Sequence, residues 1–147
     1  MDSNLAFELS ETARLLRRDF DRRAAELGVT RAQWRVLVRL SREDGLRQVA
    51  LAEALDVEPI TLCRMIDRLE EAGMVERRAD EEDRRAWRIH LTPKAGPLIE
   101  TLNTIAEDFL ADALSGIDAA EQARVRDVLG RVRANLNRGP DTRRRAS

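Results

Sequence analysis

Apolar residues recur every three or four positions over most of this chain, a spacing typical of helices that bury one face. The first such helix is predicted at about residues 4–28, and Gly28 is expected to end it. A second helix is predicted to begin at Thr30, because Thr30-x-x-Gln33 fits a capping box. The apolar faces of these two helices are predicted to carry Leu5, Leu9, Leu16, Phe20 and Leu27, and then Trp34, Leu37, Val38 and Leu40.

The last third of the chain predicts two further helices. Thr92, followed by a proline, is expected to cap the first of them, and Gly96-Pro97 predicts an irregular first turn. The pair Asp118-x-x-Glu121 fits the N-terminal cap of the second. Their apolar faces are predicted to carry Leu98, Leu102, Ile105, Phe109 and Ala113, and then Val125, Val128, Val132 and Leu136.

Between these long helices, the pattern predicts two short helices joined by a tight turn. Asp56-Val57-Glu58 is the expected turn, and Pro59 suits the first residue of a helix, where its missing N–H costs nothing. Gly73 is expected to end the second helix, about Pro59 to Ala72, as a left-handed cap. Two helices in this relation form a helix-turn-helix. Their apolar positions are Leu51, Ala52 and Leu55, and then Leu62, Ile66 and Leu69, with Met65 at the flank.

The segment after Gly73 predicts a β-hairpin. Residues 74–78 are expected to form one strand and residues 86–91 its return, since Trp87, Ile89 and Leu91 alternate with polar neighbours. The charged residues 80–85 lie between them as an exposed tip, and Leu46-Arg47 is a candidate third strand. The predicted fold class is therefore mostly α with a small β-hairpin wing (α+β), a winged helix-turn-helix with additional helices at both ends.

A helix-turn-helix with a wing is typical of a DNA-binding module. Its second helix is predicted to present Thr61, Arg64 and Arg68 on the face opposite its apolar residues. The Arg64 guanidinium can donate two hydrogen bonds to a guanine edge in the major groove. Arg84 and Arg85, at the hairpin tip, are placed to reach backbone phosphates or an adjacent minor groove.

The segment from Asp83 to Thr92 fits the pattern D-x-R-x(5)-L-T, which resembles the wing signature of the MarR family of bacterial transcription regulators. Residues 66–77, IDRLEEAGMVER, also resemble that family's exit from its recognition helix. The resemblance implies that Asp83 and Arg85 support the wing tip and contact DNA, with Asp83 holding the Arg85 side chain. The candidate DNA-binding residues are thus Pro59, Thr61, Arg64, Arg68, Asp83, Arg84 and Arg85.

The same resemblance implies a homodimer formed by the terminal helices, and the apolar stripes outside the winged module also need a partner. It implies a repressor that binds an inverted-repeat operator in double-stranded DNA. A small aromatic effector is expected to release this repressor from the DNA. The pocket residues for that effector are unassigned, with Trp34 and the helix face near Phe20 as candidates. The predicted organisation is one domain, 1–140, with the winged module at about 30–92, dimerisation helices at about 4–28 and 92–138, and a flexible basic tail at 141–147.

Charge and composition narrow this picture. The 147-residue chain has a formal net charge of −1, so any affinity for DNA must come from a local arrangement of positive charge. Arginine provides nearly all of that charge, since Lys94 is the only lysine. No apolar run is long enough to span a membrane, and the N-terminus lacks the features of a signal peptide, so a cytoplasmic protein is expected.

Three alternatives stay open at this stage. The sequence is equally consistent with Arg64 being an ordinary exposed helix residue, in an ion pair with Asp67 or Glu71, that contacts no DNA. The wing arginines fit a polar turn neutralised by its own acidic residues. Winged helices also serve as protein-interaction modules that bind no specific DNA, and a lack of salt dependence in binding to duplex DNA would identify that class.

Other chemistry is disfavoured by the residues present. Cys63 lies near a helix N-terminus beside an arginine, yet cysteine-sensing relatives carry their sensing residue near the start of the first helix, where this chain has none. His90, the only histidine, lies on a strand without a nearby cysteine or histidine cluster, so a metal site is not expected. Trp34 and Trp87 are interpreted as core and hairpin packing. No catalytic motif is visible, and neither an enzymatic activity nor a cofactor is expected.

Overall fold

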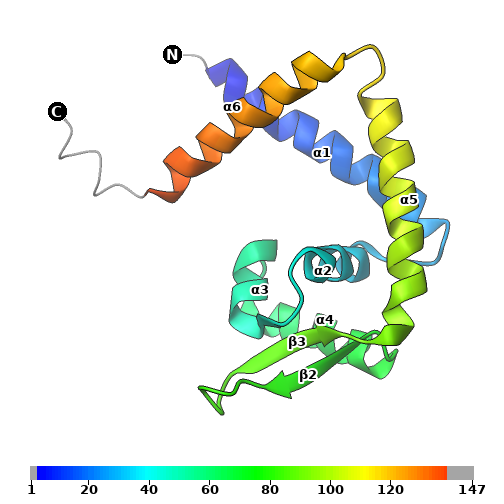
Figure 1. Ribbon diagram of the computed structural model, residues 1–147, viewed down its shortest axis with the longest axis vertical. Helices are drawn as coiled ribbons and strands as arrows, with labels where there is room; N and C mark the ends of the chain where they lie inside the picture. The colour runs from blue at the N-terminus through cyan, green and yellow to red at the C-terminus, as the bar shows by residue number, and fades with distance from the viewer. Residues whose placement is uncertain (1–2, 139–147) are drawn as a thin grey trace. The chain divides into compact units, whose positions relative to one another are not determined.

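The computed structural model describes residues 3–138, which fall into two compact units divided between Ala111 and Asp112. The chain is mostly helical and carries one small three-stranded antiparallel sheet, so the predicted fold class is confirmed (Figure 1). The single domain proposed for residues 1–140 stays a prediction. The predicted basic tail, residues 141–147, lies outside the described residues.

The first unit contains the helices that the apolar spacing predicted. They are α1 (Ser3–Ala25), α2 (Arg31–Arg42), α3 (Gln48–Leu55), α4 (Pro59–Glu71) and α5 (Gly96–Ala113), whose last two residues belong to the second unit. Helix α1 ends three residues before the predicted Gly28, which follows it in a left-handed conformation with φ of 75°. The capping box at the start of α2 is confirmed, because Thr30 Oγ1 accepts the Gln33 N–H and the Gln33 side chain accepts the Thr30 N–H.

The turn between α3 and α4 makes the helix-turn-helix. Asp56 ends α3 in the left-handed region with φ of 52°, which an aspartate tolerates better than most residues. Pro59 is the first residue of α4, as predicted. Gly73 follows α4 with φ of 76°, and the N–H groups of Gly73 and Met74 donate to the carbonyls of Glu70 and Leu69 at 2.9 Å each. These two bonds form the expected left-handed cap and turn the chain directly into the hairpin.

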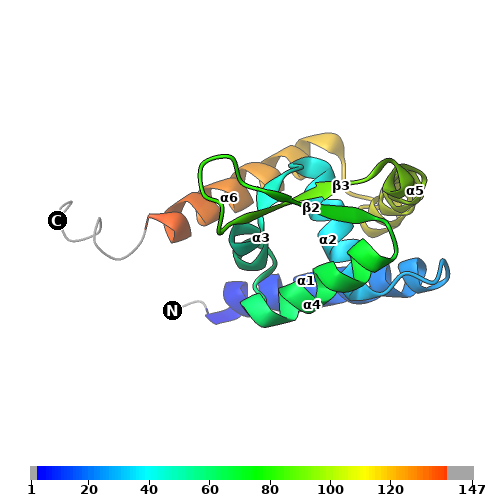
Figure 2. The ribbon, with the colours of Figure 1, turned by 90° about the horizontal axis from the view of Figure 1, so that it is seen from below.

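The sheet has three strands in the order β1-β3-β2, with β1 at Leu46–Arg47, β2 at Val75–Ala79 and β3 at Trp87–Leu91. Strand β3 is central, since it pairs with β2 along its whole length and with β1 through Ile89 and Arg88. The predicted third strand at residues 46–47 is therefore confirmed. Figure 2 shows the β2–β3 hairpin ending in a loop that extends beyond its paired strands.

The core of the first unit collects the predicted apolar faces of α2, α3 and α4 together with Val75 and Ile89 from the sheet. Trp87 is an exception, because 48% of its surface is exposed although it was interpreted as hairpin packing. Its register explains the difference: Trp87 pairs with Ala79 at the last position of the ladder, next to the hairpin loop. The alternation of the strand is real, but its apolar position next to the loop lies outside the buried core.

Thr92 differs from its predicted role. It precedes a short 3₁₀ helix, η1 (Pro93–Ala95), yet its side chain makes no capping bond there. The Thr92 hydroxyl instead donates to the carbonyl of Gly73. Thr92 thus connects the end of the hairpin to the end of α4, and the irregular start predicted at Gly96-Pro97 takes the form of η1 leading into α5.

The second unit contains α6 (Ala119–Asn137). The predicted capping box is confirmed, since Asp118 Oδ1 accepts the Glu121 N–H at 2.8 Å and Glu121 Oε2 accepts the Asp118 N–H at 3.1 Å. None of the nineteen residues of α6 is buried. Across residues 3–138, no helix combines the length and the apolar character that a membrane crossing requires.

Candidate nucleic-acid interface

Helix α4 has one buried and one exposed face, divided as the sequence predicts. Leu62, Ile66 and Leu69 are at most 1% exposed and fix the helix on the core. The opposite face presents Thr61, Arg64 and Arg68 to solvent, and Pro59 is exposed at the start of the helix. Arg64 and Arg68 are one helical turn apart, so their side chains project from the same face.

The guanidinium groups of Arg64 and Arg68 have no partner among residues 3–138. The alternative that Arg64 pairs with Asp67 is not observed, because the Asp67 carboxylate lies 2.6 Å from the guanidinium of Arg77 instead. Glu71 also makes no ion pair within the described part of the chain. Helix α4 therefore presents two guanidinium groups that no described carboxylate neutralises.

The hairpin loop, residues 80–86, presents a second pair of unneutralised arginines. Asp83, Arg84 and Arg85 are all exposed, and neither guanidinium contacts a carboxylate in the described residues. Asp83 Oδ1 accepts the backbone N–H of Arg85 at 3.0 Å. The sequence predicted that Asp83 holds the side chain of Arg85, and in this respect the prediction is wrong: Asp83 shapes the loop and leaves the Arg85 guanidinium outside it.

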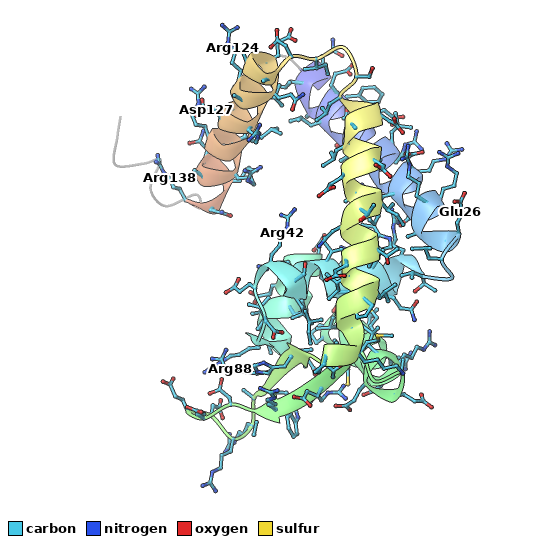
Figure 3. All side chains as sticks on the ribbon, turned by 45° about the vertical axis from the view of Figure 1, so that its right-hand side comes forward. Glu26, Arg42, Arg88, Arg124, Asp127 and Arg138 are labelled. Atoms are coloured by element: carbon cyan, nitrogen blue, oxygen red, sulfur yellow. The ribbon has the colours of Figure 1, made fainter. Side chains whose placement is uncertain are left out.

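The carboxylate that the sequence missed is Asp80. Its side chain is only 1% exposed, and its Oδ2 lies 2.9 Å from Arg47 Nε and 2.8 Å from Arg88 Nε. Its Oδ1 accepts the backbone N–H groups of Glu82 at 2.9 Å and Asp83 at 3.2 Å. Arg88 also donates to the carbonyl of Gly45 at 2.8 Å, and it lies on β3 one residue from the end of the ladder that adjoins the hairpin loop (Figure 3).

These contacts keep Asp80 ionised. The N–H of Glu82, and after it the N–H of Asp83 and the Arg47 guanidinium, lower the pKa of Asp80 to about 2 against the opposing effect of burial. Because the pKa is lowered on folding, the contribution of this carboxylate to stability is present above its unfolded pKa of about 4 and is lost only as pH falls towards 2.

Arg77 is a second connection between the hairpin and the helices, and its side chain is 15% exposed. Its guanidinium contacts Asp67 and Glu70 of α4, at 2.6 and 3.1 Å, and its Nε donates to the Gln48 side chain of α3 at 3.2 Å. It also donates to the carbonyl of Cys63 at 3.2 Å. This arginine joins β2 to both helices of the helix-turn-helix and is held away from the exposed face.

The sequence carried a partial signal for both connections. Asp80 lies two residues after the strand predicted at 74–78 and precedes two backbone N–H groups of a turn, a position that favours an Asx-type turn. Its arginine partners could not be found in this way, since Arg47 lies 33 residues earlier and contacts Asp80 only through the pairing of β1 with β3. In a segment with three other acidic residues, no pattern distinguishes the buried one.

Comparison with known proteins places this geometry in a family. The sequence profile of the MarR family matches residues 29–87, from two residues before α2 to the first residue of β3. The crystal structure of the transcriptional regulator PA3341 is 44% identical in sequence, with a TM-score of 0.84 over 92% of this chain and 99% of that one. The chain belongs to the MarR family.

Two structures of MarR-family regulators extend the comparison. A MarR transcriptional regulator from Methanosarcina mazei Go1 is 28% identical, with a TM-score of 0.81 over 91% of this chain and 96% of the other. A MarR family regulator from Listeria monocytogenes, crystallised with 26mer DNA, is 26% identical, with a TM-score of 0.80 over 92% of this chain and 90% of the other. The members of this family are transcriptional regulators, which supports DNA-binding regulation and suggests that the chain is not an enzyme.

The MarR-family chain also has an aromatic pocket, of about 370 Å³, inside its first unit. The Phe20 ring packs edge to face against two other rings. Its centroid lies 4.6 Å from that of Trp34 and 5.8 Å from that of Phe109. The Trp34 indole N–H donates to Asp21 at 2.7 Å, which fixes the ring. The lining residues, from α1, α2 and α5, are Leu16, Arg17, Phe20, Trp34, Val38, Ser41, Arg42, Asn103, Ala106, Phe109 and Leu110.

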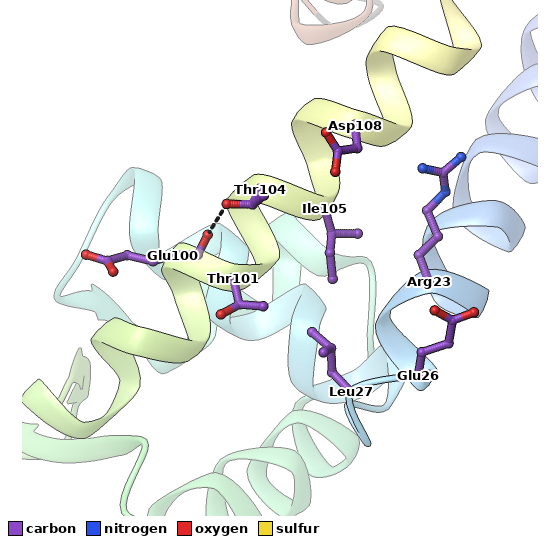
Figure 4. A pocket seen from close by; sticks show the side chains of 8 residues that line it. All are labelled: Arg23, Glu26, Leu27, Glu100, Thr101, Thr104, Ile105 and Asp108. Carbon is purple, nitrogen blue, oxygen red and sulfur yellow. Dashed lines mark hydrogen bonds between the residues drawn. The ribbon is translucent and has the colours of Figure 1, made fainter.

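A larger pocket, of about 640 Å³, lies between the end of α1 and α5, and its chemistry is different (Figure 4). It contains three carboxylates, from Glu26, Glu100 and Asp108, and no aromatic ring. The hydroxyls of Thr101 and Thr104 donate to carbonyls of their own helix at 3.0 and 3.1 Å, so these two groups do not donate hydrogen bonds into the pocket. An aromatic anion fits the smaller pocket better.

Cys63 and His90 occupy supporting positions. Cys63 is half-buried on α4, with its sulfur 3.7 Å from the Arg77 guanidinium. His90 Nδ1 lies 3.8 Å from Asp44 Oδ2, beside Gly45. Among the described residues, no group of three or more histidine, cysteine, aspartate or glutamate side chains is arranged to hold a metal ion.

Proposed function

We propose that this protein is a homodimeric transcriptional repressor that recognises an inverted repeat in double-stranded DNA. Helix α4 enters the major groove, and the hairpin, called the wing below, contacts the sugar–phosphate backbone or the adjacent minor groove. Pro59, Thr61, Arg64 and Arg68 form the part that reads bases, and Asp83, Arg84 and Arg85 form the part at the wing tip.

One observation carries the proposal: within residues 46–92, the helix-turn-helix and the wing, the arginines without a described carboxylate partner are the ones at these two positions. Arg77, Arg88 and Arg47 are neutralised by acidic residues, whereas Arg64, Arg68, Arg84 and Arg85 are exposed and unpaired within residues 3–138. Because the whole chain has a net charge of −1, the positive charge that these four guanidinium groups present on α4 and at the wing tip is a local feature. Unpaired guanidinium groups can bind both phosphate and guanine edges through two hydrogen bonds at once.

The selection of bound sequences from random duplex DNA tests the proposal. A two-fold dimer presents its two copies of α4 in a symmetric relation, so the selected sites are expected to be inverted repeats with half-site centres about one helical turn, roughly 10 bp, apart. The enrichment of asymmetric sequences alone would contradict the inverted repeat. Affinity should fall steeply with salt, because phosphate contacts release counterions.

The alternative function is that of a winged-helix module which binds another protein. The salt series separates the two, since a protein-interaction module has no reason to bind duplex DNA in proportion to its phosphate contacts. Binding to duplex DNA without salt dependence would favour the alternative. The unpaired arginines on both α4 and the wing favour DNA.

The homodimer is supported by apolar side chains that the chain leaves exposed. In the first unit, Leu5 and Phe7 of α1 are 61% and 63% exposed, and in the second unit Val125 and Leu136 of α6 are 55% and 70% exposed. A nineteen-residue helix without a buried residue gains little from folding alone. A symmetric partner would bury these faces and supply the second copy of α4 that an inverted repeat requires. A regulator of this kind acts where the chromosome lies, which is the reason for proposing a cytoplasmic location.

The effector is proposed to be a small aromatic anion bound against Phe20, Trp34 and Phe109. The pocket volume, about 370 Å³, lies within the range of small-molecule sites. Arg17 and Arg42 line it without an ion-pair partner among residues 3–138, and they can hold a carboxylate or phenolate while the rings pack on the aromatic side chains. Helix α2 contributes Trp34 to this pocket and Leu37 to the core that also holds α4, so a shift of α2 on binding would reach the recognition helix.

Benzoate is a suitable probe of this pocket. In the Trp87→Phe variant Trp34 is the only tryptophan, and its fluorescence is expected to change saturably as benzoate is added. Arg42→Gln should weaken that response, whereas Arg84→Gln, which removes the same charge on the wing, should leave it unchanged. If the pocket controls release, benzoate and operator DNA must lower each other's affinity by the same factor. An unsaturable change, or one unaffected by Arg42→Gln, would argue against this pocket.

A further inference from the structure

We infer that Asp80 positions the wing for DNA: it holds the loop that carries Arg84 and Arg85 in one conformation and ties that loop to the start of α3. The inference rests on the proposed function and adds a residue that touches no DNA. Asp80 is the buried acid at the end of β2, and none of its oxygen atoms is left to contact a ligand.

The contacts of Asp80 come from three parts of the chain. Arg47 immediately precedes α3, Arg88 lies on β3, and the N–H groups of Glu82 and Asp83 belong to the loop itself. One carboxylate therefore fixes the first half of the loop to β1 and to β3. Charge-assisted bonds of this kind are stronger and more directional than neutral ones.

A chain of hydrogen bonds leads from Asp80 to the backbone of the arginines at the tip of the loop. Asp83, whose N–H is held by Asp80, uses its own Oδ1 to accept the N–H of Arg85. The loop closes on the other side through the N–H of Asp80, which donates to the carbonyl of Ala86 at 3.0 Å. Each step is a hydrogen bond to the backbone, so the backbone under Arg84 and Arg85 is fixed while their side chains stay available.

The wing is also fixed to the helix-turn-helix at two adjacent residues, Arg47, which precedes α3, and Gln48, the first residue of α3. Arg47 binds Asp80, and the next residue, Gln48, accepts from Arg77, which in turn binds Asp67 and Glu70 of α4. Wing and recognition helix are thus connected through residues 47–48. If Asp80 is lost, the tip is expected to move relative to α4, and the phosphate contacts would no longer form together with the base contacts.

For the Asp80→Asn variant, a purely electrostatic role and a positioning role of Asp80 predict opposite changes in the affinity for DNA. Removing a negative charge from a DNA-binding face should strengthen binding through the general attraction to phosphate. Loss of a positioning residue should weaken it. Glu81→Gln is the matched control, because Glu81 is the next residue, is exposed, and makes no hydrogen bond or ion pair with another described residue.

The experiment measures the affinity of the full chain for its selected duplex over a series of salt concentrations. We expect Glu81→Gln to bind as well as the wild type or better. We expect Asp80→Asn to bind at least about tenfold more weakly and to lose about one unit of salt slope for each phosphate contact that is lost. In an Arg84→Ala/Arg85→Ala background, Asp80→Asn should have little further effect, since the contacts that it positions are already gone.

The folding of each variant is monitored by urea denaturation. Arg88→Gln is a second, milder variant, since it leaves Asp80 in contact with Arg47 and with both loop N–H groups. A graded loss of wing contacts in Arg88→Gln supports the inference even where Asp80→Asn is unstable. Asp80→Asn behaving like Glu81→Gln, or adding its full effect to the Arg84→Ala/Arg85→Ala background, would overturn it. Wild-type protein without salt-dependent binding to any duplex would instead refute the proposed function, so the two failures are distinguishable.

Discussion

Replacing Arg64 by alanine is expected to weaken operator binding by about 1–3 kcal/mol per half-site and to relax base preference at one position in each half. Arg64 is exposed on the face of α4 opposite Leu62, Ile66 and Leu69, and no described carboxylate competes for its guanidinium. A guanidinium in the major groove donates two hydrogen bonds to guanine, a geometry that no other base pair offers at the same position. A dimer with two half-sites would lose about twice this free energy.

The wing arginines serve as the comparison for Arg64. Arg84→Ala and Arg85→Ala should each lower affinity for specific and scrambled duplexes alike and reduce the salt slope by about one unit per phosphate contact. Arg78→Ala is a matched control for the loss of an arginine, since Arg78 lies on β2 and is paired with Glu76. All variants are titrated against both duplexes at several salt concentrations. If Arg64→Ala weakened both duplexes equally while Arg85→Ala abolished only the specific complex, the two roles would be reversed.

The local features of this fold could be predicted because each depends on residues close in the sequence. The capping boxes at Thr30 and Asp118, the proline at the start of α4 and the left-handed Gly73 all follow from backbone groups within one turn of a helix. The division of α4 into a buried and an exposed face follows from its spacing alone. The elements and the exposed arginines of the candidate interface were therefore accessible to sequence reasoning.

The connections between elements were not accessible in the same way. Asp80 and Asp83 are both acidic residues of one loop, and the sequence favoured Asp83 as the support of the wing through its place in the D-x-R pattern. The difference between them arises from the register of β1 and β2 on β3, which brings Arg47 and Arg88 to Asp80. The exposure of Trp87 has a similar origin, because its strand position is apolar but lies at the end of the ladder. Such features depend on which strands pair, and apolar spacing does not report that.

The replacement of Leu136 by aspartate is expected to dissociate the dimer and, with it, to remove most of the affinity for an inverted repeat. Leu136 is 70% exposed in the single chain, so the substitution should leave the folding of one chain unchanged. In a dimer that buries this face, an unpaired carboxylate costs about 2 kcal/mol per chain, hence about 4 kcal/mol per dimer or roughly a thousandfold in the dissociation constant. Sedimentation equilibrium at micromolar concentration measures the change in mass.

Asn135→Asp is the matched control for Leu136→Asp, because it places the same charge on the neighbouring, exposed and polar position of α6. It should sediment as the wild type does. The loss of the dimer should also separate the two contributions to DNA binding, since a monomer keeps its α4 and its wing but binds only one half-site at a time. Its salt slope should therefore fall to about half that of the dimer, because half of the phosphate contacts are made. An unchanged mass for Leu136→Asp would exclude the end of α6 from the interface, and a wild-type protein that sediments as a monomer at this concentration would refute the homodimer itself.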